Sequence, residues 1–112
     1  MRAFLARSSS SVSLIVRRMF RVTLICDGLP AAAGEEAARD IAKEFADSRQ
    51  WHSRVTCDWD GARLVLRSEN DFDETGQATL DEFGDCIAAY VTDYAGSSIR
   101  IESISEFDHD NA

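Results

Sequence analysis

The alternation of apolar and polar residues along the chain predicts four strands. A period of two, with β-branched and aromatic residues at the apolar positions, is typical of a strand with one buried face. This pattern occurs at residues 19–26, 51–59, 62–68 and 98–107. Asp60-Gly61 separates the second run from the third, which is a strong signal for a hairpin. In the last run Ile104 is out of phase, which predicts a β-bulge or a strand end near Ser103.

Two other stretches, residues 30–49 and 75–94, carry apolar residues at the three- and four-residue spacing of a helix. The first stripe is rich in small side chains and is therefore expected to pack closely on a sheet: Ala37, Ala38, Ile41, Ala42 and Phe45. The second stripe has larger side chains: Leu80, Phe83, Ile87, Val91 and Tyr94. Ala95-Gly96 follows it, as expected after the end of a helix.

The order β-α-β-β-α-β predicts an α+β domain of the ferredoxin-like, split βαβ plan. Right-handed crossovers then give a four-stranded antiparallel sheet in the order 4-1-3-2, with two helices on one face. The chain has 112 residues, of which 45% are hydrophobic, enough for one core. We expect a single domain at 19–107, a disordered or cleavable extension at 1–18 and a polar tail at 108–112. This plan hosts enzymes, regulatory modules and binding domains alike, so it predicts no function.

Charge divides the chain into two parts. Residues 1–18 carry four arginines and no acid, and the remainder carries a charge of −12, which together give the net charge of −8. A body this acidic is repelled by a phosphate backbone, which argues against direct nucleic-acid binding. The extension is rich in Arg and Ser, like a mitochondrial transit peptide. A weak bacterial signal peptide, or a true start at Met19, are the alternatives.

Apolar runs and cysteine spacing indicate the compartment. No apolar run is long enough to span a bilayer, so we expect no membrane partner. The three cysteines, Cys26, Cys57 and Cys86, form no C-x-x-C pair and are typical of buried thiols in a reducing compartment. We therefore expect a cytoplasmic protein, or one of the mitochondrial matrix if the extension is a transit peptide.

Arginine gathers on the sheet face that the helices are predicted to leave open. Five of the seven arginines after residue 18 fall there, together with His52: Arg21, Arg54, Arg63, Arg67 and Arg100. The plain interpretation is that arginine stems cover a solvated sheet. The alternative is that this face binds a protein partner or forms a homodimer. Our leading hypothesis for the function is therefore a non-catalytic interaction or regulatory module that acts through this face.

Residues 71–82 (DFDETGQATLDE) resemble an EF-hand calcium loop. The resemblance implies oxygen ligands from Asp71, Asp73, Thr75 and Glu82, and calcium is the one cofactor that the sequence suggests. However, the preceding segment alternates like a strand, where an EF-hand has a helix. The competing interpretation is that the acids lie at a helix N-terminus, where the helix dipole favours them. A second cation set, made of Asp27, Asn70, Asp71 and Asp73, would form if the loops after 19–26 and 62–68 share one end of the sheet.

Two further classes of function remain. The predicted helices carry acids that would let the domain mimic nucleic acid and block a basic groove on a phage or host protein: Glu36, Asp40, Glu44, Asp81, Glu82 and Asp85. Catalysis has little support, because the chain has only two histidines, His52 and His109, and no nucleophile elbow, P-loop or zinc-protease motif. Cys26 falls on the apolar face of its strand. We therefore do not expect the protein to be an enzyme.

Overall fold

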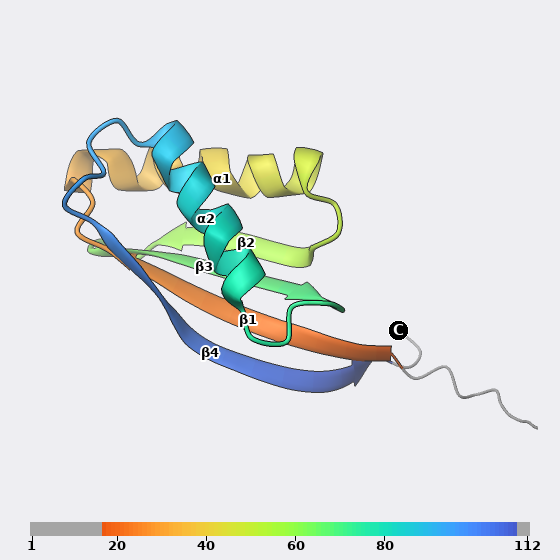
Figure 1. Ribbon diagram of the computed structural model, residues 1–112. Helices are drawn as coiled ribbons and strands as arrows, with labels where there is room; N and C mark the ends of the chain where they lie inside the picture. Colours follow the sequence, from red (N-terminus) through yellow and green to blue (C-terminus); the bar gives the residue numbers. More distant parts are fainter. Residues whose placement is uncertain (1–16, 110–112) are drawn as a thin grey trace, which may run out of the picture.

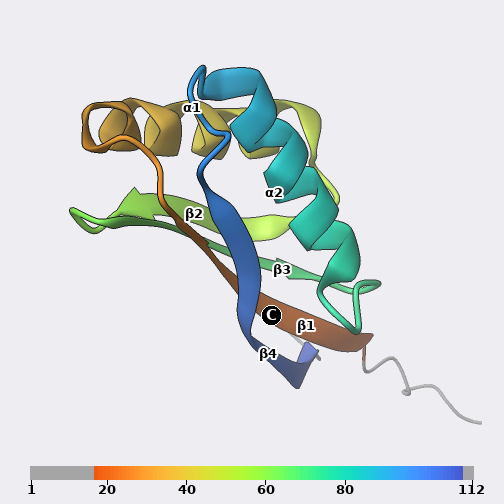
Figure 2. The same cartoon turned by 60° about the vertical axis from the view of Figure 1, so that its left-hand side comes forward.

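The computed structural model describes residues 17–109, which form an α+β domain of two layers (Figure 1). The elements are β1 (Arg17–Asp27), a short 3-10 turn (Ala31–Ala33), α1 (Gly34–Ser48), β2 (Ser53–Trp59), β3 (Arg63–Asn70), α2 (Gln77–Tyr90) and β4 (Ser98–His109). The strands form one antiparallel sheet in the order β2-β3-β1-β4, which confirms the predicted strand order. Both helices lie over the same face of this sheet (Figure 2).

The core lies between the helices and the sheet. Alternate residues of β1 and β3 point into it because successive side chains of a strand face opposite sides. Its largest fully buried members are Phe45, Phe83, Leu24, Ile41, Leu64, Leu66 and Val22. Burial of each such side chain contributes about 1.5–3 kcal/mol, so this cluster supplies most of the driving force for folding. Helix α1 approaches the sheet closely, as its small residues predicted: a Cβ at Gly34 would lie 2.1 Å from the ring of Trp59.

A β-bulge in each of the edge strands, β4 and β2, changes which of their residues face the helices. The register between β1 and β4 shifts at Thr23/Leu24, which leaves Glu102 as an extra residue and returns Ile104 to the helix side. The bulge predicted near Ser103 is thus confirmed. The register of β2 against β3 also shifts, between Ser53 and Thr56.

The second bulge was not predicted. Arg54 occupies it with a positive φ of 51°. The alternation therefore breaks there, and His52 is buried on the helix side. The prediction that His52 lies on the open sheet face was wrong for this reason.

Several element ends differ from the predicted ones, among them the starts of β2, α1 and α2, and two of the differences change where residues lie. Helix α2 stops at Tyr90, because Val91 turns to an extended backbone and buries its side chain, so Tyr94 lies in the following loop. Strand β1 begins at Arg17, two residues inside the predicted extension, and pairs along β4 as far as His109. Residues 1–16 and 110–112 lie outside the described residues. Over residues 17–109, neither helix has the length and apolarity needed to cross a membrane.

Candidate functional site

The sheet face opposite the helices, here called the open face, brings the five predicted arginines together. Their strands carry them as follows: Arg21 on β1, Arg54 on β2, Arg63 and Arg67 on β3, and Arg100 on β4. In the part of the chain that the structure describes, no helix covers this face (Figure 2). The register of the sheet places Arg21, Arg63, Arg67 and Arg100 on this face, and Arg54 lies in the bulge of β2, where it contacts Glu69 of the same face.

Two of the arginines share one carboxylate. Glu69 of β3 is mostly buried on the open face, and its side chain is only 10% exposed. Arg21 Nε lies 2.9 Å from Glu69 Oε2, and Arg54 Nε lies 3.5 Å from Glu69 Oε1. Arg21 also places its guanidinium 4.3 Å from the ring centre of Phe107, a cation–π contact. These contacts tie both guanidinium groups to Glu69 on the open face.

The outer arginines are paired as well. Arg63 Nε lies 3.0 Å from Asp60 Oδ2 across the hairpin turn, and Arg100 pairs with Asp27 at the end of β1. Exposed pairs of this kind contribute about 0–1 kcal/mol each, so they add little to stability. Their main effect is on the field of the open face, which is nearly balanced in charge instead of strongly positive.

Two charges of the open face stand apart from these pairs. Arg67 is exposed between Thr23 of β1 and Thr56 of β2, and no acid of residues 17–109 lies within ion-pair distance of it. Asp58 of β2 is exposed on the same face, opposite Val65, and it likewise has no basic partner within the described range. On β2 and β3, one charge of each sign is therefore left without a partner within the described residues.

The open face also buries apolar side chains without help from a helix. Ile25 is 1% exposed and Val65 is 6% exposed, although both point away from the helices. The register places Arg100 opposite Ile25, so the long charged side chains of the same face provide the cover. Coverage of the sheet by arginine stems, the plain interpretation, thus accounts for most of this arrangement.

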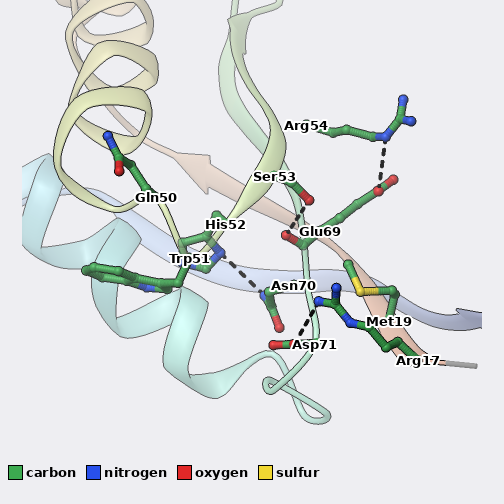
Figure 3. A pocket seen from close by; sticks show the side chains of 10 residues that line it. All are labelled: Arg17, Met19, Gln50, Trp51, His52, Ser53, Arg54, Glu69, Asn70 and Asp71. Atoms are coloured by element: carbon green, nitrogen blue, oxygen red, sulfur yellow. Dashed lines mark hydrogen bonds and ion pairs between the residues drawn. The ribbon is translucent and has the colours of Figure 1, made fainter. Parts of the chain in front are cut away.

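A cleft lies where the open face meets the bulge of β2 (Figure 3). Its volume is about 590 Å³, and its lining includes Arg17, Met19, Trp51, Ser53, Arg54 and Glu69. Trp51 is 54% exposed, and its indole N–H donates to Glu82 at 3.2 Å. Arg17 donates to Asp71 at 2.9 Å on the opposite wall. Sequence reasoning missed Trp51 because it assigned this residue to the buried side of a strand that begins only at Ser53.

A directed network of hydrogen bonds lies beneath the cleft. Asn70 Oδ1 accepts from the backbone N–H groups of Phe72 (3.1 Å) and Asp73 (2.8 Å), which fixes the orientation of the amide. Asn70 Nδ2 therefore faces His52 Nδ1 and Thr79 Oγ1, both at 3.4 Å. His52 then accepts at Nδ1 and donates from Nε2 to the carboxylate of Glu82 at 3.2 Å. Since the ring is fully buried, His52 serves the fold and is closed to a ligand.

The four residues of the calcium prediction are directed to different partners. Asp73 caps α2, because its carboxylate accepts from the N–H of Ala78 (3.3 Å), the N–H of Thr79 (2.7 Å) and the hydroxyl of Thr79 (2.5 Å). The placement of Asp73 at a helix N-terminus is thus confirmed. The others contact separate groups: Asp71 pairs with Arg17, Thr75 accepts from the N–H of Gln77, and Glu82 faces His52.

Cation binding gains no support from the rest of the fold. Over residues 17–109, no three His, Cys, Asp or Glu side chains are grouped as a metal would need, and calcium binding stays a prediction. The second cation set was wrong. In the sheet register, Asp27 lies opposite Arg63 at one end of β1, whereas Asn70 lies opposite Phe20 towards the other end. The two sets of oxygen ligands are therefore at opposite ends of the sheet, because β1 and β3 are antiparallel.

The remaining candidate groups are also engaged. All three cysteines are buried and free, and burial raises the pKa of Cys57 to about 12 and that of Cys86 to about 11. Burial also raises the pKa of Cys26. None of them is therefore a thiolate at neutral pH. Of the acids expected on the outer helix face, Glu82 instead turns inward to His52 and Arg49.

Comparison with known proteins does not change this picture. No protein-family model matches the chain. No curated protein matches it significantly in sequence. Function must therefore be argued from the geometry of the open face.

Proposed function

We propose that the chain is a non-catalytic protein-interaction module and that the open face is its binding surface. The observation that carries this proposal is Arg67, an exposed arginine without an acidic partner among the described residues, at the centre of an uncovered sheet. A planar guanidinium with free donors recognises a carboxylate in two parallel hydrogen bonds. A partner that offers an acid to this position gains a charge-assisted contact that the isolated domain lacks.

We also propose that the domain follows the ferredoxin-like plan. The element order, the strand order and the shared face of the two helices support this assignment. In this plan the sheet face opposite the helices is free for binding, so the assignment and the proposed surface are consistent with each other.

A non-catalytic role agrees with the state of the reactive side chains. His52 is enclosed by Phe45, Phe72 and Trp51, with both ring nitrogens in hydrogen bonds. A general base or nucleophile must reach its substrate, and neither this ring nor the three buried thiols is accessible.

Photo-cross-linking tests the proposal. A photoreactive residue at Thr56 of the full chain lies beside Arg67 on the open face, and the same residue at Arg39 lies on the outer side of α1 as a control. We expect adducts with a protein, either another protein or a second copy, from position 56 only, and we expect R67E to abolish them. Equal adducts from both positions, or none from position 56 in the cell, would refute the proposal.

A further inference from the structure

We propose that the partner of the open face is a second copy of this chain. In this dimer the two open faces meet about a two-fold axis, and Arg67 of each copy pairs with Asp58 of the other. The inference rests on the proposed function, because it takes the open face as the binding surface and adds the identity of the partner.

The first argument is the reciprocity of the two charges. Arg67 and Asp58 lie on neighbouring strands, two positions apart along the register, and both are exposed on the open face. In a two-fold contact every residue is used twice. One arginine and one aspartate on the same face therefore give two equivalent ion pairs across the axis, and no described charge near them has to give up an existing partner.

The second argument is the charge of the remaining surface. The chain has a net charge of −8, so two copies repel each other in most orientations. The outer sides of the helices carry exposed acids such as Glu35, Glu36, Asp81 and Asp85. On the open face, by contrast, the charges of arginines and acids nearly balance. A face-to-face arrangement is thus the one that keeps the acidic helices of two copies apart.

The third argument is the length of the side chains around Arg67 on the open face. Its cross-strand neighbours there, Thr23 and Thr56, have short polar side chains, and so does Ser103, which lies beyond Thr23 on β4. Sheets that pack face to face lie about 10 Å apart, and short side chains permit that approach while a long arginine spans the gap. One face of a four-stranded sheet offers a limited contact area, whereas stable complexes bury roughly 800 Å² per partner. We therefore expect a dimer with a dissociation constant in the micromolar range.

A charge-swap experiment tests this pairing by sedimentation equilibrium of the full chain. We expect the wild-type chain to dimerise. R67E and D58R should each weaken dimerisation at least tenfold, because each places like charges opposite one another twice. An equimolar mixture of the two variants should recover a dimer. In that heterodimer the glutamate introduced by R67E faces the arginine introduced by D58R, and the native Asp58 faces the native Arg67.

The control is K43E, which reverses a charge on the outer side of α1 and should leave dimerisation unchanged. A wild-type chain that stays monomeric up to about 1 mM, the limit of weak association, would overturn the inference, and so would a variant mixture that fails to associate. If adducts to a different protein still form from position 56, the open face remains the binding surface and only the second copy is refuted. If no adducts form, the proposed function fails as well.

Discussion

Replacement of Asp73, in the loop before α2, by alanine should strongly destabilise the domain. Asp73 is buried, and its carboxylate accepts three hydrogen bonds from Ala78 and Thr79. Alanine leaves the N–H groups of Ala78 and Thr79, the second and third residues of α2, without their side-chain acceptor. It also leaves the hydroxyl of Thr79, which is fully buried, without the carboxylate to which it donates.

The magnitude follows from these two losses. Removal of a side chain that caps a helix costs about 0.5–2 kcal/mol. A buried donor left without a partner costs about 1–3 kcal/mol more. We therefore expect D73A to lower the free energy of unfolding by about 3 kcal/mol, and D73N by a smaller amount, because the amide keeps one acceptor oxygen.

Urea denaturation followed by tryptophan fluorescence measures the effect. The matched control is E74A in the adjacent position, where the exposed carboxylate lies 3.6 Å from Arg18 and should contribute less than about 0.5 kcal/mol. The m-value should stay constant, since the same surface is exposed on unfolding. If D73A and E74A destabilise the domain equally, the capping role assigned to Asp73 is refuted.

Three further predictions concern packing, pH and the accessibility of the thiols. G34A should destabilise the domain by about 1–3 kcal/mol in the same urea assay, because the new methyl group meets the ring of Trp59. G96A should have no effect, since nothing lies within 4 Å of a Cβ there. Equal effects of the two changes would contradict the close packing of α1. Below a pH of about 9, ionisation of the thiols should not change the free energy of unfolding. As the pH rises toward about 12 the free energy of unfolding should fall, because the unfolded chain loses thiol protons that Cys57 and Cys86 keep in the fold. In the native state at pH 8 a thiol reagent should label neither cysteine, and rapid labelling would show that the core opens more easily than the structure implies.

The strands were predictable where one simple period governs the residues. Val22, Leu24, Leu64 and Leu66 alternate without interruption, and these positions form the core. The bulge in β4 was also predictable, because Ile104 breaks the alternation visibly. A local apolar signal of this kind is sufficient when burial alone decides which face a residue takes.

The bulge of β2 and the network below it were not predictable. His52 is polar, so its burial depends on Glu82 and Asn70, which come from α2 and from the end of β3. The end of α2 escaped prediction in the same way, because Val91 continues the helical stripe but is buried from an extended backbone. Contacts between residues distant in sequence decide these positions, and the local pattern does not record them.

The central claim is that two copies meet through the open face, and amide NMR shifts over a concentration series test it most directly. Spectra of the full chain from about 10 µM to about 1 mM span the range expected for a small interface. The account predicts concentration-dependent shifts at Thr23, Thr56 and Arg67 of the open face, and none at Asp40 or Lys43 on the outer side of α1. Shifts confined to α1 and α2, or no shifts over the whole range, would contradict it.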